Sequence, residues 1–373
     1  MKPIRILYVN GGPLNRGGIE SYMMNYYRNF DRNKIQIDFV SIGLEVAAYD
    51  YEIKSLGGQI YYIPKKSKDY FGYLKAIREI FKTKKYKIVH THMDAMGMTV
   101  LKEAKKYGIP IRIAHSHNTQ HLTKNLIKLR VNEHARKNIK KYATHLFACS
   151  EEAGKWLFGE EVCKNREVDI IRNAIDIKRF SFDEEKRNYI RKKYGISNDE
   201  ILVGHIGRFD YQKNHQFLID FFSKASNENE KIKLMLIGEG HLKNEIERKI
   251  NDIGIKEKVI LTGGVNNSND YYNAFDIFVL PSLFEGLPVV GIEAQANGVD
   301  CIFSNTITKE LLINSNIDFL SIQNVSEWVE IIKNKTIYNR SNNEINISDH
   351  GYNIRHEAKL LQEKYISMYE ENL

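Results

Sequence analysis

The sequence predicts an α/β protein of two doubly wound, Rossmann-like domains with a cleft between them. Three observations support this fold class. The 373 residues exceed one ordinary core, strand-like apolar runs alternate with stretches of helical period, and the series restarts after a polar stretch at residues 182–200. Such alternation implies parallel sheets with helices on both faces, and ligands at the carboxyl ends of the strands.

The predicted strands form two series. The first series comprises Ile4–Asn10, Ile35–Val40, Gln59–Ile63, Ile88–Thr91, Ile111–His115, His145–Cys149 and Val168–Ile171. The second comprises Ile201–Gly207, Lys233–Ile237, Val259–Thr262, Asp276–Leu280, Cys301–Ser304 and Asp318–Ile322. Segments such as Tyr70–Phe81 and Thr99–Tyr107 between them have a helical period.

We place the domains at residues 1–172 and 173–352 and interpret Phe182–Glu200 as the tail of the linker. The amphipathic stretch at residues 353–373 predicts a final helix, which we expect to pack back onto the first domain.

Composition indicates an ordinary globular enzyme, with 42% hydrophobic residues. No apolar run approaches the roughly 20 residues of a membrane helix. The first residues predict a strand rather than a signal peptide. Three cysteines form no disulfide framework, so we expect a cytoplasmic location; Cys149 and Cys301, in strand-like segments, suit a buried core.

Charge is unevenly distributed along the chain. Residues 1–180 hold 33 Lys and Arg against 18 Asp and Glu, whereas residues 181–373 hold 22 against 29. The basic half favours an anionic partner such as phosphate, nucleic acid or a lipid surface, with a merely solvated surface as the alternative. Basic platforms interleaved with aromatic residues are not evident, so we expect no nucleic acid.

The strongest motif covers residues 276–298, where a strand-like run passes through a turn into a helix. Gly286 allows close backbone approach, Pro288 suits the first turn of the helix, and amides at the helix N-terminus can bind phosphate. Glu285 and Glu293 flank this anion site, and a carboxylate accepts two hydrogen bonds from vicinal sugar hydroxyls. The alternative is a capping Glu and an exposed helical Glu.

A second motif covers residues 201–219, where a strand ends in a loop that carries Arg208 and Lys213. Arg supplies a fork for phosphate oxygens, and Lys supplies a mobile point charge. Both could therefore bind the phosphate groups of a ligand. A lone loop Lys would otherwise be solvated surface.

Two further loops follow strands of the first domain. Gly17 and Gly18 offer amides at a helix start, although their loop is not a dinucleotide-binding G-x-G-x-x-G and a tight turn is the alternative. His115 and His117 fall on one face of a strand end, so both can line the cleft, with a structural role as the alternative. Of the two, we favour His117 as the site residue, because its small polar neighbours indicate a loop.

Together these motifs resemble the retaining glycosyltransferases of group 1, or family 4, which have the GT-B fold, and the resemblance spans nearly the whole chain. It implies an acceptor-side first domain and a second domain that binds a nucleotide sugar, with Glu285 near the donor sugar and Glu293 on the ribose. It implies catalytic roles for His117, Arg208, Lys213 and Glu285. It implies a donor-binding site made of Gly17, Gly18, Arg208, Lys213, Gly240, Glu285, Gly286, Leu287 and Glu293.

The resemblance implies hexosyl transfer, with retention of configuration, from a nucleotide diphosphate sugar to a saccharide or lipid-linked saccharide. The favoured donor is a UDP-sugar. The motif sequences Glu-Gly-Leu-Pro and His-Ser-His-Asn are most similar to those of bacterial enzymes of capsular or extracellular polysaccharide synthesis. The alternatives are a nucleotide-sugar epimerase of the same fold and a non-catalytic nucleotide-sugar-binding protein. The sequence leaves open the sugar, base, acceptor, linkage and oligomeric state.

We expect no cofactor and no essential metal. Asp-x-Asp, the metal-bridging device of the other large glycosyltransferase fold, does not occur in the sequence. The pairs His90/His92 and His115/His117 could ligate zinc, but no carboxylate or thiolate cluster completes a site.

Residues 122–142 predict a basic amphipathic helix with apolar Leu122, Leu126, Leu129 and Ile139, and Lys124 among its cations. The imperfect stripe also suits an ordinary solvated helix. The basic balance of the same half favours contact with an anionic membrane at its cytoplasmic face.

Overall fold

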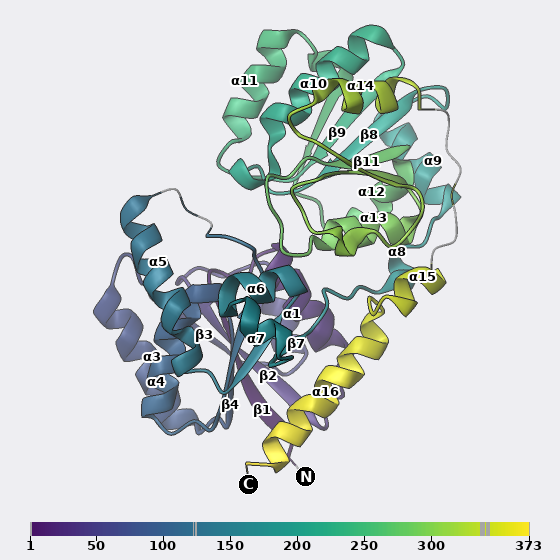
Figure 1. Ribbon diagram of the computed structural model, residues 1–373. Coiled ribbons are helices and arrows are strands. Elements are labelled where there is room, and N and C mark those ends of the chain that lie inside the picture. Colours follow the sequence, from purple (N-terminus) through teal and green to yellow (C-terminus); the bar gives the residue numbers. More distant parts are fainter. Residues whose placement is uncertain (1, 122, 124, 336–339, 341–343, 373) are drawn as a thin grey trace. The chain divides into compact units, whose positions relative to one another are not determined.

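The computed structural model describes residues 2–121, 123, 125–335, 340 and 344–372. The chain divides into two compact units, one formed by residues 1–174 and 354–373 and the other by residues 175–353 (Figure 1). The boundary predicted from the sequence, after residue 172, lies two residues before this one. The first unit holds 34 Lys and Arg against 21 Asp and Glu, and the second holds 21 against 26.

Unit 1 is built on a seven-stranded parallel sheet of order β3-β2-β1-β4-β5-β6-β7. Its strands are β1 (Ile4–Asn10), β2 (Ile35–Ile42), β3 (Ile60–Ile63), β4 (Ile88–His92), β5 (Ile111–Ser116), β6 (His145–Ala148) and β7 (Val168–Ile170). Its helices are α1 (Gly18–Asn29), α2 (Asp50–Ser55), α3 (Tyr70–Lys84), η1 (Asp94–Gly97), α4 (Met98–Lys106), α5 (Leu126–Asn138), η2 (Ile139–Lys141), α6 (Glu151–Phe158), α7 (Glu160–Lys164) and α16 (Ile354–Glu370).

Alternate residues of β1 face two different cores, as the pleat requires. Tyr8 packs with α1 and α16, whose Tyr22 and Tyr365 are fully buried. Leu7 packs with α3 and α4 on the opposite face. Both faces of the sheet are therefore covered, and the C-terminal helix completes one of the two cores.

Unit 2 is built on a six-stranded parallel sheet of order β10-β9-β8-β11-β12-β13. Its strands are β8 (Ile201–Ile206), β9 (Ile232–Ile237), β10 (Val259–Gly263), β11 (Ile277–Leu280), β12 (Asp300–Ser304) and β13 (Ile317–Leu320). Its helices are α8 (Ile177–Phe180), α9 (Glu184–Lys193), η3 (Tyr211–Lys213), α10 (His215–Glu228), α11 (Lys243–Ile253), η4 (Lys256–Lys258), α12 (Ser268–Ala274), α13 (Val289–Asn297), η5 (Lys309–Leu311), α14 (Val325–Lys333) and α15 (Glu344–Asp349).

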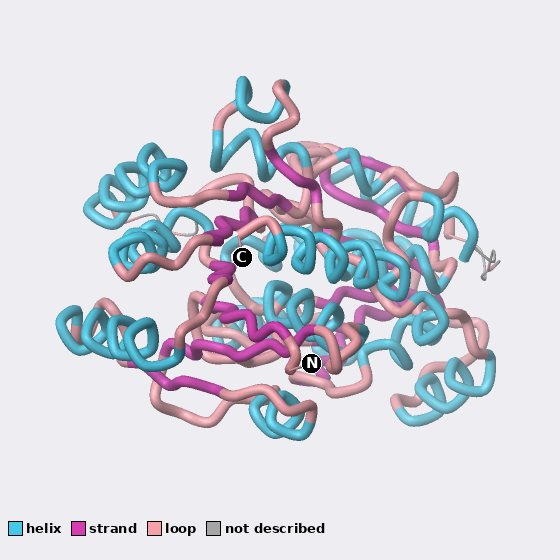
Figure 2. The backbone as a smooth tube through the Cα atoms, turned by 90° about the horizontal axis from the view of Figure 1, so that it is seen from below, coloured by secondary structure: helices cyan, strands magenta, loops and turns pink. Residues whose placement is uncertain are grey.

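The two-sheet fold class is confirmed. Every predicted strand is present in the described residues, with its ends within two residues of the prediction. Figure 2 distinguishes the strands, in magenta, from the helices, in cyan. The predicted final helix is α16, and its buried Ala358, Leu361 and Tyr365 belong to the core of unit 1.

The interpretation of Phe182–Glu200 as linker was wrong. Helix α9 lies within it, begins at an Asp183 cap, and buries Arg187 and Arg191 one turn apart. Arg187 Nη2 lies 2.7 Å from Asp276 Oδ1, and Arg191 Nη1 lies 3.0 Å from Asp276 Oδ2. The sequence alone suggests that these arginines are exposed to solvent, because their partner Asp276 lies more than 80 positions away in the chain.

Two smaller expectations concern exposure. Cys149 and Cys301 are buried, as predicted. Within the described ranges, no helix is both long enough and apolar enough to cross a membrane.

Candidate active site

The loops after β8 and β11 bring Lys213 and Glu285 together. Lys213 Nζ donates to Glu285 Oε1 over 2.6 Å, and both side chains are largely buried. The carboxylate has two further donors: Ser282 Oγ lies 2.9 Å from Oε1, and Gln212 Nε2 lies 3.0 Å from Oε2. Glu285 is therefore held by a cation on one side and by neutral donors on others.

Further hydrogen bonds to backbone carbonyls hold the same two loops together. Leu283 N donates to the Gln212 carbonyl over 2.9 Å, and Gln212 Nε2 donates to the Phe284 carbonyl over 2.9 Å. Asn214, which starts α10 in a left-handed conformation (φ 56°), donates to the Pro281 carbonyl over 3.1 Å. These bonds fix the Lys213 loop against the Glu285 loop.

The pair lies at the topological switch point of the second sheet. The strand order reverses between β8 and β11, and in doubly wound sheets ligands bind beside the carboxyl ends of the strands at this point. Two of the predicted catalytic residues thus meet where the fold favours a ligand.

Glycines let neighbouring loops approach this position. A Cβ on Gly238 would lie 2.0 Å from the Gly207 carbonyl oxygen, and one on Gly240 would lie 2.2 Å from the Phe209 carbonyl oxygen. Gly238 also has φ 149°, which favours glycine. The predicted donor residue Gly240 therefore lies directly against the loop that follows β8.

Arg208 lies on that loop but does not join the ion pair. Its side chain is 68% exposed, and its Nε lies 3.5 Å from Asp210 Oδ2. The exposed guanidinium remains accessible to an anion in solution.

The second carboxylate, Glu293, lies in α13, one turn after its start. Pro288 is the N-cap of this helix, so it immediately precedes the first turn rather than forming it. The Tyr272 hydroxyl donates to Glu293 Oε2 over 2.8 Å. Burial raises the pKa of Glu293 to about 7, although the Tyr272 hydrogen bond and Arg179 oppose the shift. Gly286 and Leu287, in the preceding turn, are buried.

In unit 1, the glycine loop leads into α1, which begins at Gly18. A Cβ on Gly17 would lie 2.3 Å from Glu20 Oε2, whereas a Cβ on Gly18 would meet no atom within 4 Å. Asn10 Nδ2 donates to Glu20 Oε1 over 2.8 Å. Gly17 thus makes room for the Glu20 carboxylate, which favours the turn-forming interpretation there, and Gly18 faces open space.

His115 and His117 lie at the end of β5, beside His90 and His92 of β4. His115 is fully buried, and His117 is 7% exposed. Burial lowers the pKa of all four histidines, that of His117 to about 3, so all four are neutral. Of the two alternatives that the sequence leaves open, His117 lies nearer the surface.

A metal ion could be held by this cluster, since His90, His92 and His115 each offer a nitrogen within 4.8 Å of the others. However, His90 Nε2 and His115 Nδ1 are 3.0 Å apart in rings only 7° from parallel. Facing nitrogens at that separation share a proton, and the hydrogen bond occupies the lone pair that a metal ion would need. The geometry fits hydrogen-bonded imidazoles better.

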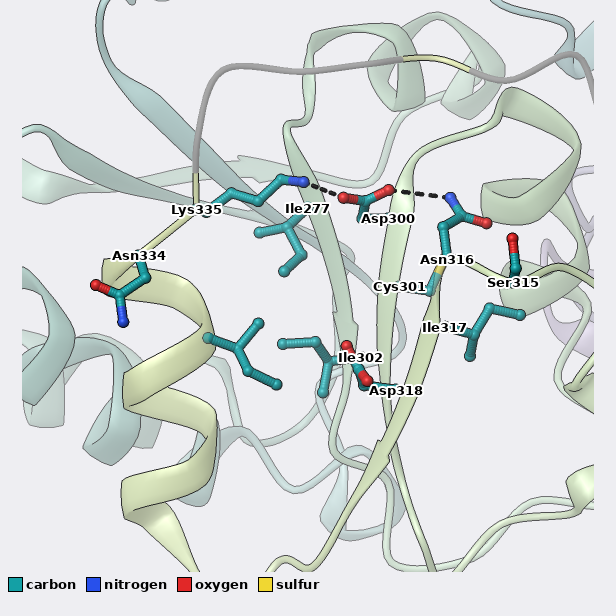
Figure 3. Close-up of a pocket in the computed structure, with 11 residues that line it drawn as sticks. Ile277, Asp300, Cys301, Ile302, Ser315, Asn316, Ile317, Asp318, Asn334 and Lys335 are labelled. Atoms are coloured by element: carbon teal, nitrogen blue, oxygen red, sulfur yellow. Dashed lines mark hydrogen bonds and ion pairs between the residues drawn. The ribbon is translucent and has the colours of Figure 1, made fainter.

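A pocket on unit 2 lies apart from this chemistry (Figure 3). It is lined by Ile277, Asp300 and Ile317 at the amino ends of β11, β12 and β13. The Asp300 carboxylate already pairs with Lys335 and accepts from Asn316. The pocket therefore lies at the amino ends of the strands, whereas the switch-point site lies at their carboxyl ends.

Sequence reasoning missed three residues that hold the predicted ones. Gln212 and Ser282 follow strand ends, so polar character directly after β8 and β11 could have indicated them. Tyr272 gives no such indication, because it precedes its strand within α12.

Comparison with known proteins identifies the family. A model described as "Glycosyl transferases group 1" matches residues 186–334, and one described as "Glycosyltransferase Family 4" matches residues 16–179. The putative glycosyltransferase EpsF of Bacillus subtilis is 34% identical over 338 residues, covering 88% of this chain and 86% of that protein. The chain belongs to the group 1, family 4 glycosyltransferases. It is an enzyme of GT-B type.

Two further relatives and one solved structure are similar to this chain over most of its length. The Escherichia coli UDP-Gal:alpha-D-GlcNAc-diphosphoundecaprenol alpha-1,3-galactosyltransferase is 27% identical, over 79% of each chain. The Staphylococcus aureus capsular polysaccharide biosynthesis glycosyltransferase CapH is 25% identical, covering 78% of this chain and 79% of that protein. Anabaena HepE, solved in complex with UDP-glucose, superimposes with a TM-score of 0.80 at 16% identity, over 97% of this chain and 99% of that one.

Proposed function

We propose that this glycosyltransferase moves a hexosyl residue from a UDP-sugar to a saccharide or lipid-linked saccharide, with retention of configuration, in surface polysaccharide biosynthesis. The observation that carries the proposal is the Lys213–Glu285 pair at the switch point of the second sheet. A relative that uses UDP-galactose and an undecaprenol-linked acceptor supports the donor and acceptor classes.

Each predicted residue receives a role from its chemistry. Lys213 and the exposed Arg208 bind the diphosphate and stabilise the charge that develops as the C1–O bond breaks. Glu285 accepts from hydroxyls of the donor sugar, and Glu293 accepts from the ribose. Gly240, Gly286 and Leu287 supply close backbone contact with the nucleotide sugar, as do amides at Gly17 and Gly18. His117 contacts the donor sugar.

Retention follows, in this proposal, from attack on the same face as the departing diphosphate, whose oxygen takes the proton of the acceptor hydroxyl. The C1–O bond to the acceptor forms as the bond to the diphosphate breaks. Cationic side chains hold the phosphates, so transfer needs no metal ion and no cofactor.

The proposal extends to peripheral membrane contact through α5. Leu126, Ile127 and Val131 on this helix are 74%, 75% and 58% exposed, and Lys128 and Arg130 beside them are also exposed. Exposed apolar residues next to cations suit the interface of an anionic membrane. Leu122 and Lys124 of the predicted segment lie outside the described residues, and Ile139 is buried.

The decisive experiment is a donor screen with product analysis. Purified enzyme is incubated with UDP-, GDP- and ADP-hexoses and an undecaprenyl-diphosphate-linked saccharide, and the anomeric configuration of the product is read by NMR. We expect turnover of a UDP-hexose to an α-linked product from an α-configured donor. An inverted product would refute retention, and donor interconversion without transfer would indicate an epimerase.

A further inference from the structure

The four histidines at the ends of β4 and β5 form two hydrogen-bonded pairs stacked on each other. His90 Nε2 lies 3.0 Å from His115 Nδ1, and His92 Nδ1 lies 3.0 Å from His117 Nε2. The His90 and His92 ring centroids are 4.1 Å apart, as are those of His115 and His117. Because β4 and β5 are adjacent parallel strands, alternate residues place all four rings on one face.

A count of protons decides which way the His92–His117 bond runs. Each neutral imidazole carries one N–H and one acceptor nitrogen. His92 Nε2 is buried, and it has no hydrogen-bond partner among the residues that the structure describes. If His117 donated, the proton of His92 would lie on that nitrogen as a buried, unpaired N–H, which folded proteins rarely tolerate. If His92 donates from Nδ1, its Nε2 carries no proton and buries only a lone pair. His117 then accepts at Nε2, so its own proton lies on Nδ1.

The surroundings hold His117 in this orientation. The edge of Tyr22 contacts its ring, with centroids 5.1 Å apart, and His115 stacks on its face. Asp94 accepts from the His117 backbone N over 2.6 Å and from Asn118 Nδ2 over 2.8 Å, which anchors the strand end. Of the four histidines, only His117 reaches the surface, and Nδ1 is its nitrogen not bonded to His92.

We infer that His92 is a positioning residue that fixes His117 as an Nδ1–H donor toward an oxygen of the bound hexose, and thereby excludes His117 as a general base. The inference rests on the proposed function, which brings a hexose to His117. A neutral N–H donor suits a neutral hydroxyl or ring oxygen, whereas the diphosphate has Lys213 and Arg208 as partners.

The tautomers can be read directly in the enzyme without substrate. In two-bond ¹H–¹⁵N correlation spectra of the histidine-labelled protein, we expect His117 to be protonated at Nδ1 and bare at Nε2, and His92 likewise. His92→Asn keeps an amide donor near the position of Nδ1 and should preserve the His117 tautomer. His92→Phe keeps a ring but no donor, and should leave His117 as a mixture of tautomers.

Tyr365→Phe is the matched control. It removes the hydroxyl that lies 2.7 Å from His90 Nδ1 and leaves the His92–His117 pair intact, so the His117 tautomer should not change. Addition of UDP-glucose to the wild type should shift the His117 Nδ1–H resonance. In transfer assays, His92→Phe should lower kcat roughly 3- to 10-fold, the value of one hydrogen bond, and His92→Asn should restore it.

Protonation of His117 at Nε2 in the wild type would overturn the inference, and this spectrum needs no variant to fold. An unchanged tautomer in His92→Phe, or no response of His117 to a UDP-glucose that binds, would overturn it as well. Failure of the proposed function has a different signature: no donor is turned over by the wild type, whatever the tautomer.

Discussion

The ammonium of Lys213 lies 2.6 Å from the carboxylate of Glu285, although the two residues are 72 positions apart in the chain. A cation assigned to phosphate is thus paired with a carboxylate assigned to a sugar. An incoming diphosphate can take over the ammonium because Gln212 and Ser282 continue to hold the carboxylate. In the proposed function, the ammonium would exchange the carboxylate for the diphosphate on donor binding, and Glu285 would keep its neutral hydrogen-bond donors.

Lys213→Ala should lower the rate of transfer by on the order of 10²–10³, since it removes a preorganised charge from the leaving group. Glu285→Ala should abolish transfer too. Steady-state assays with folding checked by circular dichroism measure both. Lys243→Ala is the control, because Lys243 forms only an exposed pair with Glu239. Activity of either site variant within a few-fold of wild type would contradict the assignment.

Transfer should persist after dialysis against excess EDTA. The reason is that Arg208 and Lys213 supply the positive charge for which other glycosyltransferases use a metal ion. The measurement is the initial rate with and without chelator. Complete loss of activity that Mg²⁺ or Mn²⁺ restores would show that the phosphates are held in another way.

Removing the exposed apolar residues of α5 should weaken binding to anionic vesicles. We expect co-sedimentation of the wild type with vesicles that contain phosphatidylglycerol, and its steep decline with salt. Leu126, Ile127 and Val131 changed together to Gln should sediment less, and so should the variant with Lys128 and Arg130 changed to Gln. Each Lys or Arg near such a surface contributes about 1 kcal/mol.

Arg136 is best left in place in that experiment. Its guanidinium bonds Glu133 over 2.8 Å and the Trp156 carbonyl over 2.6 Å, so its loss would disturb the helix itself. Tyr189→Gln with Ile253→Gln on unit 2 is the control for loss of exposed apolar side chains. Equal sedimentation of all variants with the wild type would remove α5 as the contact.

Glu293→Gln should stabilise the protein without donor, and increasingly so as pH rises. Burial raises the pKa of Glu293 from 4.5 to about 7, so the protonated form is favoured in the fold. That stability is fully present below about pH 4.5 and is lost as pH rises through about 7. The variant should gain little at pH 5 and on the order of 2–3 kcal/mol at pH 8.

Urea unfolding at three pH values measures this difference, with the exposed Glu327→Gln as the control. A gain for Glu293→Gln that is the same at pH 5 and at pH 8 would show that Glu293 is ionised throughout.

Asp276→Asn should cost about 3–5 kcal/mol of stability, because it leaves the buried Arg187 and Arg191 without their carboxylate. Asp199→Asn breaks an exposed pair with Lys231 and should cost less than about 1 kcal/mol. Thermal or urea unfolding compares the two. Similar losses of unfolding free energy in the two variants would contradict the prediction that the buried ion pairs of Asp276 stabilise the fold more than the exposed pair of Asp199.

The strands and the switch-point loops could be predicted from the sequence, because alternation of apolar runs and polar residues after strand ends are local patterns. Helix α9 could not, since its arginines are buried only by virtue of distant Asp276. The pairing of Lys213 with Glu285 likewise depends on the sheet order, which places β8 beside β11. For His115 and His117, alternation gave the shared face, and only the fold shows which one reaches the surface.

The last helix has a consequence for synthesis on the ribosome. Residues 175–353 are complete before α16 is made, yet the core beside Tyr8 needs Ala358, Leu361 and Tyr365 from that helix. The part of unit 1 that precedes residue 175 must therefore wait for α16, while the intervening unit can fold ahead of it. A premature stop after residue 353 would spare the loops of Lys213 and Glu285 and damage instead a core built mostly from residues far upstream of that stop.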